Sequence, residues 1–158
     1  QGTTDVSDGG IHHIALVSDP DGGEVRFYVD GELEGTSGAP AIESNDNPMM
    51  IGENPDARNR TWHGMIDDVG IWARPISADE VATIWNDGDG TPLVTTPAGG
   101  RWVSAVPDMI AYWPFDGDLD DAVGDSHGTG QGGDPIAFAD GQFGEGIAPN
   151  EPGCFGIH

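Results

Sequence analysis

The sequence contains no lysine, and its five arginines stand against 28 aspartates and glutamates, which gives a formal net charge of −23 over 158 residues. Nucleic acids and anionic lipid surfaces are bound through clusters of lysine and arginine. We therefore exclude a nucleic acid as the partner. Long apolar runs are also missing, since none approaches the ~20 residues that span a bilayer. We expect no membrane insertion.

Cysteine is nearly absent as well. Cys154 is the single one, so no disulfide can form within this chain. We expect Cys154 to be a small buried apolar side chain, and an intermolecular bridge is the alternative. The sequence also lacks a G-x-S-x-G motif and a P-loop, which removes two common signatures of catalysis.

Glycine and proline, in contrast, are abundant. The 26 glycines and 12 prolines make up about a quarter of the sequence, roughly twice the usual share. Turn formers spread between short apolar runs are typical of β-proteins rather than helical bundles. Hydrophobic residues reach 36%, and five are tryptophans, which is enough for a packed core. The composition predicts an all-β fold.

The clearest local pattern is a β-hairpin near the start of the chain. A mostly apolar, β-branched run over residues 11–17 predicts a strand. Val25 and Phe27 then alternate with polar neighbours at the period of a strand. Asp30-Gly31 follows as a two-residue turn that requires positive φ, and Leu33 begins the returning strand.

One short helix is predicted over residues 77–86. Ser77 with Glu80 three residues later forms a capping box, and Val81 and Ile84 supply an apolar face. Further strands are expected at residues 49–52, over 62–77, from Ile110 onward, on both sides of Asp140-Gly141, and at the last residues of the sequence.

Two long runs of sequence follow the pattern of a known family. The first run consists of IHHIALVSDPDGGEVRFYVDGELEG and HGMIDDVGIWARPISADEVATIWNDG. The second run consists of MIAYWPFDGDLDDAVGDSHGTGQGG and FADGQFGEGIA. They resemble the C-terminal half and the N-terminal opening of a concanavalin A-like, laminin G-like jelly-roll domain. Ile11 stands where the family usually places Trp, and Gly70 where a larger polar residue is common. The resemblance implies an antiparallel β-sandwich with one short helix.

The two resembling runs stand in reverse order. We predict the C-terminal half of one module over residues 1–88, a Pro- and Gly-rich linker over 89–107, and the N-terminal half of another module over 108–158. Tandem modules of a longer protein explain this order best. The alternative is that both halves close one sandwich, within one chain or between chains by strand exchange.

The excess of acids has two compatible explanations. Acids spread along the whole chain are typical of a halophilic surface, where salt screens their repulsion. Carboxylates are also the ligands that calcium prefers. The resemblance implies that the WPFD loop and the IDDV strand lie close together, where members of the family often hold a structural calcium ion.

The predicted metal ligands are four aspartates, completed by carbonyls from residues 124–128. Because adjacent residues of a strand point to opposite faces, we expect only one of Asp67 and Asp68 at the ion. The remaining acids of the WPFD loop are expected to be solvated surface groups, namely Asp118, Asp120 and Asp121. The ligand set is Asp67, Asp68, Asp116 and Asp125.

Trp62 is the aromatic residue best suited to meet a ligand. Exposed aromatic faces stack on pyranose rings, and Trp62 lies close in sequence to Arg58 and Asn59, which are also predicted to bind. The tryptophans at apolar-periodic positions are expected in the core, namely Trp72, Trp85 and Trp113. The histidines lack the spacing of a zinc site and are expected to be structural.

We therefore predict a secreted or cell-surface, non-catalytic binding or adhesion module that is stabilised by calcium and faces a glycan, the matrix or a surface protein. Glycosidases that share this sandwich carry an E-x-D-x-x-E strand, which this sequence lacks. The alternative is a structural subunit of a surface layer or filament, which would self-associate by strand exchange between half-modules.

Overall fold

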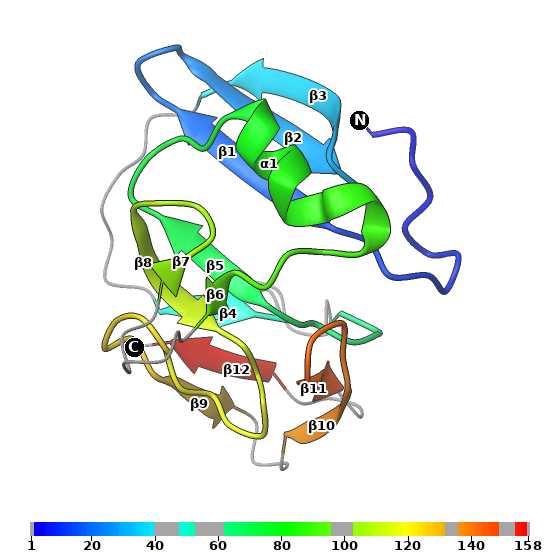
Figure 1. Cartoon of the computed structure of the whole chain (residues 1–158), viewed down its shortest axis with the longest axis vertical. Coiled ribbons are helices and arrows are strands. Elements are labelled where there is room, and N and C mark those ends of the chain that lie inside the picture. Colours follow the sequence, from blue (N-terminus) through cyan, green and yellow to red (C-terminus); the bar gives the residue numbers. More distant parts are fainter. Residues whose placement is uncertain are drawn as a thin grey trace. The chain divides into compact units, whose positions relative to one another are not determined.

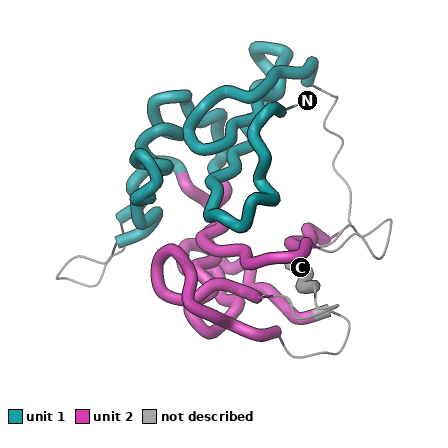
Figure 2. The backbone as a smooth tube through the Cα atoms, turned by 90° about the vertical axis from the view of Figure 1, so that its right-hand side faces the viewer, with its two compact units in different colours: residues 1–43, 72–108 teal, residues 44–71, 109–158 magenta. Residues whose placement is uncertain are grey.

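In a computed structural model, the described residues of the chain form short β-strands and one α-helix (Figure 1). It divides into two compact units, which Figure 2 colours separately. The all-β prediction is confirmed. The first unit comprises Gln1–Glu43 and Trp72–Asp108, and the second Ser44–Ile71 and Met109–His158. The structure describes residues 2–39, 48–52, 62–95, 103–131, 136–148 and 154–157.

The first unit is built on the predicted hairpin. Its sheet has the order β1-β2-β3 and is antiparallel throughout. Asp30 and Gly31 form the turn with φ of 52° and 79°, which is the positive pair that a two-residue turn requires. The hairpin prediction is confirmed, with the first strand starting three residues later than expected. The strands are β1 (Ile14–Asp19), β2 (Glu24–Val29) and β3 (Glu32–Gly38).

The helix α1 (Ala78–Trp85) is capped as the sequence predicts. The Ser77 hydroxyl accepts from the amide of Glu80, whose carboxylate accepts from the amide of Ser77. The helix buries Val81 and Ile84 and ends at Asn86, which has a left-handed conformation and begins the 3-10 turn η1 (Asn86–Gly88). No helix of the described residues has both the length and the apolar character needed to cross a membrane.

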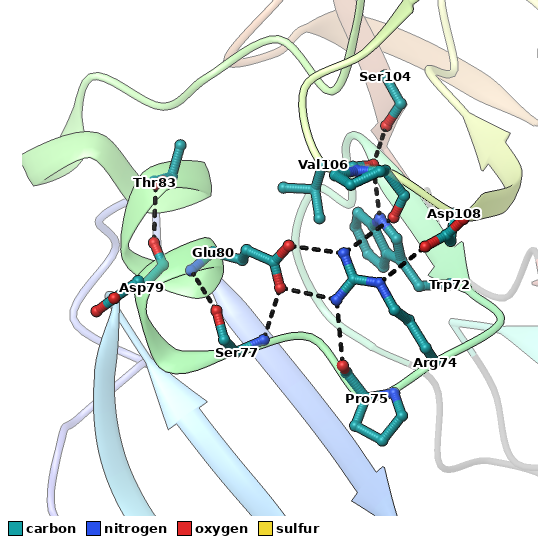
Figure 3. A network of polar contacts seen from close by, with 11 residues as sticks. Trp72, Arg74, Pro75, Ser77, Asp79, Glu80, Thr83, Ser104, Val106 and Asp108 are labelled. Carbon is teal, nitrogen blue, oxygen red and sulfur yellow. Dashed lines mark hydrogen bonds and ion pairs between the residues drawn. The ribbon is translucent and has the colours of Figure 1, made fainter.

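Arg74 ties the start of α1 to the end of the first unit (Figure 3). Its guanidinium donates to both carboxylate oxygens of Glu80 at 2.6 and 2.8 Å, and its Nε donates to Asp108 at 3.1 Å. Arg74 and the amide of Ser77 lower the pKa of Glu80 to about 2. Such a bidentate pair fixes geometry as well as charge, so we assign Arg74 a structural role.

Residues 89–107, the predicted linker, contribute packed structure to the first unit where they are described. Two short antiparallel strands pair, β6 (Val94–Thr95) and β7 (Val103–Ser104). Leu93 and Val106 flank them and are buried. The assignment of residues 1–88 and 108–158 to different modules stays a prediction, although the second compact unit combines residues 44–71 with residues 109–158.

The second unit brings strands from distant parts of the sequence together. The strand order is β4-β12-β9 in one sheet, β5-β8 in another and β10-β11 in a third. The sequence did not predict β9, because its glycines have low strand propensity. The strands are β4 (Met49–Ile51), β5 (Val69–Trp72), β8 (Met109–Trp113), β9 (Gly128–Gln131), β10 (Ala137–Asp140), β11 (Glu145–Ala148) and β12 (Cys154–Ile157).

The core of the second unit is centred on β8 and the residues that follow it. Trp113 and Phe115 are fully buried, and they cluster with Ala111 and Ile147. The Trp113 indole donates to the carbonyl of Ser126 at 2.9 Å, so its polar edge is satisfied inside the core. Partly buried side chains surround this cluster, namely Ile51, Ile66, Val69, Ile71, Leu119, Ile136 and Phe138.

Candidate functional site

Asp67 and Asp68 lie in the second unit just before β5 rather than inside it. Ile66 forms an isolated bridge with Ile147, and Asp68 then takes a left-handed φ of 53°. Alternation between faces applies only to extended backbone. The premise of the expectation that only one of the two carboxylates lies at the ion is therefore absent, and the charge of Asp67 raises the pKa of Asp68.

Asp67 is hydrogen-bonded by the turn between β10 and β11. Its Oδ2 accepts from the amide of Gln142 at 2.7 Å and from that of Phe143 at 3.4 Å. A Cβ at Gly141 would lie 2.2 Å from the same oxygen, so the turn can approach only because this residue is a glycine. Burial raises the pKa of Asp67 even though these amides oppose it.

Asp68 is held from the other side by β8. Its Oδ1 accepts a hydrogen bond from the Tyr112 hydroxyl, and Tyr112 is itself buried. Burial raises the pKa of Asp68, the Tyr112 hydroxyl opposes this, and the charges of Asp67 and Asp116 add to the rise, which brings the pKa to about 6. The carboxylate therefore stands in a place that disfavours its ionised form.

Asp116 joins the group from the loop after β8. It is exposed, and it follows Phe115, which has a φ of 61°. Its Oδ1 accepts from the amide of Glu145 at 2.8 Å. A Cβ at Gly144 would lie 1.9 Å from that oxygen. The turn that hydrogen-bonds to Asp67 thus also contacts Asp116.

The fourth predicted ligand, Asp125, is not in this group of described contacts. It is exposed and lies in the loop that Asp121 organises, beside Gly124 and Ser126. The amides that donate to Asp67 and Asp116 belong to residues 142–145. The expected carbonyl ligands from residues 124–128 stay a prediction. Nothing in the sequence around Gly141 and Gly144 except their glycines points to this role.

The three aspartates form an incomplete polar site. Oδ1 of Asp67 and Oδ2 of Asp68 are buried and have no hydrogen-bond partner in the part of the chain that the structure describes. Unpartnered carboxylate oxygens are the donors that a hard cation such as Ca²⁺ takes in shells of six to eight oxygens, so these residues fit that ion. As they stand, no three Asp, Glu, His or Cys side chains of the described residues form a group that could hold a metal. Further ligands would be carbonyls and water.

Asp121 proves to be a structural residue that sequence reasoning missed. It is only 5% exposed, so the expectation of a solvated surface acid is wrong. Its Oδ1 accepts from the amides of Tyr112, Val123 and Gly124 at 2.9 to 3.0 Å, and its Oδ2 from that of Ser126 at 3.1 Å. The small residues after Asp121 are typical of such a side-chain turn.

Trp62 is the predicted ligand-binding residue that the structure describes. Its side chain is 42% exposed, and its amide donates to the carbonyl of Gly52 at 2.7 Å. A Cβ at Gly64 would lie 3.2 Å from its Nε1, so the ring rests on that glycine. Trp113 is buried and Trp72 and Trp85 are partly buried, as predicted. Arg58 and Asn59 lie outside the described residues.

Comparison with known proteins supplies one match. A family model described as the concanavalin A-like lectin/glucanases superfamily matches residues 1–82. These residues include the hairpin β2-β3, the helix start, and the Asp67-Asp68 pair. No curated protein and no solved structure matches the chain.

Proposed function

Because the chain belongs to the concanavalin A-like lectin/glucanases superfamily, we propose that it is a non-catalytic, calcium-stabilised module that binds a glycan or a matrix component outside the cell. The laminin G-like lectin family supports glycan or protein binding in general, and its members are typically extracellular and non-catalytic. Fold alone does not fix function. The site must therefore supply the argument.

The observation that carries this proposal is the pair of unpartnered oxygens on Asp67 and Asp68. A bound Ca²⁺ would supply the positive charge that these two carboxylates lack. Tyr112 orients Asp68 through its hydroxyl, and the amides of residues 142–145 orient Asp67 and Asp116. The chain thus presents preoriented carboxylates, of which that of Asp116 is exposed to solvent.

Trp62 would provide the surface on which a sugar ring stacks. It stands on the same covalent segment as the aspartates, five residues before Asp67, and part of its ring is open to solvent. Its backbone bond to Gly52 and the contact with Gly64 hold the ring in place. A fixed aromatic face loses little conformational entropy on binding.

A glycan array tests this function, probed with the full chain in Ca²⁺ and again in chelator. We expect binding that Trp62→Ala weakens about tenfold, the free energy of one aromatic contact. The double variant Asp67→Asn with Asp68→Asn should remove the calcium dependence. Ile110→Ala, which truncates another exposed apolar residue, serves as the matched control. Equal binding by Trp62→Ala and wild type would contradict the ligand-facing role of Trp62.

A second candidate function is assembly by strand exchange, and the free edge of β1 favours it. Within the described residues β1 pairs only with β2, and its Leu16 and Ile14 are 71% and 46% exposed. An edge strand offers unpaired amides and carbonyls to another chain. Light scattering in high salt, which screens the net charge, should then give masses above 16.5 kDa. A monomer at every concentration would reject this alternative.

A further inference from the structure

The segment before β1 is fastened to the β2-β3 hairpin at two places in the first unit. We call residues 2–12 the strap (dark blue in Figure 1). Near its start, Thr3 and Thr4 donate to the carboxylate of Glu34 on β3, with 3.0 Å between the Thr3 hydroxyl and Oε2. At its end, His12 contacts Asp30 in the turn between β2 and β3. These two fastenings differ in their chemistry.

His12 stands between two carboxylates. Its Nδ1 lies 2.8 Å from Oδ2 of Asp30, and its Nε2 lies 3.0 Å from Oδ1 of Asp8. The imidazole is only 15% exposed. A neutral imidazole has one N–H and can donate to only one of these oxygens, whereas the imidazolium donates to both. The arrangement is therefore complete only when His12 carries its proton.

The neighbouring titratable groups reinforce this dependence. Asp5 adds its charge from within the strap, and Asp30 is fixed by accepting from the amide of His13 at 2.9 Å. His13 is partly buried, which lowers its pKa although the charge of Asp30 opposes this, so His13 is less prone than His12 to carry a positive charge. The threonine contacts lower the pKa of Glu34 to about 2, so that fastening does not titrate near neutrality.

We propose that the strap is a pH-sensitive latch, fastened at its second point by protonated His12 and loosened there when His12 loses its proton. The Glu34 fastening persists and neutral His12 keeps one of its two hydrogen bonds, so deprotonation loosens residues 5–12 and leaves residues 3 and 4 bound. This inference does not depend on the proposed glycan function, because it concerns contacts within the first unit alone.

The direction of the effect follows from linkage. Asp30 first and Asp8 second raise the pKa of His12, so the fastened strap binds its proton more tightly than the free strap. Fastening is therefore complete below the ordinary histidine pKa and is lost as the pH rises through the raised value. For each unit by which that pKa is raised, the ratio of fastened to free strap falls tenfold across the transition.

Nuclear magnetic resonance of the full ¹⁵N- and ¹³C-labelled chain tests the latch from about pH 5.5 to about pH 9. We expect the His12 ring to titrate above its ordinary range. The amides of Gly9 and Gly10 should shift with the same midpoint, and their heteronuclear Overhauser effects should fall as the pH rises. Amides that stay equally rigid across the titration would overturn the proposal.

Two variants separate the latch from a general effect of pH. His12→Gln should make residues 5–10 as mobile at low pH as they are in the wild type at high pH. His63→Gln removes an exposed histidine of the other unit and should leave the titration unchanged. A rigid strap in His12→Gln, or the same loss of pH dependence in His63→Gln, would refute the role of His12. If His12→Gln does not fold, the coincidence of midpoints in the wild type decides.

Discussion

Asp121 and the pair Asp67-Asp68 are all withdrawn from solvent in the second unit, but their carboxylates differ in how fully they are hydrogen-bonded. Asp121 accepts hydrogen bonds from four backbone amides. Asp67 and Asp68 each keep one buried oxygen without a partner among the described residues. Burial would raise the pKa of Asp121, but its amides lower it, whereas Asp67 and Asp68 have raised values.

This difference separates a finished structural residue from an incomplete site. The amino acid is the same in both places, and burial penalises the charge in both. The number of N–H groups aimed at the carboxylate decides the outcome. An acid-rich sequence therefore does not identify a metal site by composition, because Asp121, the most buried aspartate among the described residues, needs no ion.

The largest effect that this comparison predicts is the loss of the Asp121 carboxylate. Asp121→Ala leaves one buried and three partly buried amides without an acceptor, and we expect it to lower the free energy of unfolding by about 3–5 kcal/mol. Urea unfolding followed by tryptophan fluorescence measures this loss. Asp120→Ala removes the adjacent exposed carboxylate and should cost less than about 0.5 kcal/mol. Similar values for both variants would contradict the structural role of Asp121.

The next effect is the response to calcium. Ca²⁺ at about one hundred times its dissociation constant should raise the free energy of unfolding by about 2.7 kcal/mol, since the ion binds only the folded chain. A thermal melt at constant ionic strength should shift upward by about 5–10 °C. An unchanged melt would remove calcium from the proposed function.

Variants show whether the calcium shift of the melt depends on the Asp67-Asp68 pair or on the Asp121 loop. The double variant Asp67→Asn with Asp68→Asn should abolish the calcium shift, because both unpartnered oxygens lose their charge. Asp118→Asn changes an exposed acid and should leave the shift intact. Asp125, the fourth predicted ligand, is exposed and lies in the Asp121 loop. A reduced calcium shift in Asp125→Asn would show that Asp125 contributes to the site, and an unchanged shift would show that it does not.

The elements that the sequence predicted well are those whose causes lie in neighbouring residues. Asp30-Gly31 sets the turn of the first hairpin, and Ser77 with Glu80 sets the start of α1. Paired strands also form on both sides of Asp140-Gly141, although the positive φ of the turn between them lies at Gly144. Such signals need no knowledge of the rest of the chain.

The candidate site was predicted only in part, because its geometry depends on tertiary contacts. Asp67, Asp68 and Asp116 interact electrostatically, but the amide that binds Asp67 comes from Gln142, 75 residues away. The left-handed backbone at Asp68 also broke the alternation on which the sequence argument relied. Neither fact has a local signature in the sequence.

Matched glycines test the two regions with smaller effects. A Cβ at Gly124 would lie 2.8 Å from the Asp121 carboxylate and 2.9 Å from the carbonyl of Ile110, which cannot turn away. We expect Gly124→Ala to cost about 2 kcal/mol. Gly144→Ala meets the carboxylate of exposed Asp116, which can rotate, so we expect about 1 kcal/mol from its φ of +75°.

Gly23→Ala supplies the control for Gly144, because Gly23 also has a positive φ, +70°, but nothing lies within 4 Å of its Cβ position. The two variants should lose similar stability in chelator. In Ca²⁺, only Gly144→Ala should show a reduced upward shift of the melt, because only it displaces Asp116. Equal shifts would separate Asp116 from the calcium response.

The smallest expected effect is a difference in pH dependence, measured in chelator. The pKa of Asp68 is raised to about 6, so between about pH 4 and about pH 6 the folded chain binds more protons there than the unfolded chain. Its contribution to stability therefore falls as the pH rises through that window.

Asp121, whose pKa is lowered, contributes fully above the ordinary aspartate pKa and loses its contribution only as the pH falls below it. Asp68→Asn should remove about 1 kcal/mol of the first slope, reduced by the partial exposure of the group, and leave the acid limb that Asp121 causes. Urea unfolding at a series of pH values gives both slopes. If the free energy of unfolding depends on pH in the same way in the variant and the wild type, the folded structure does not raise the pKa of Asp68.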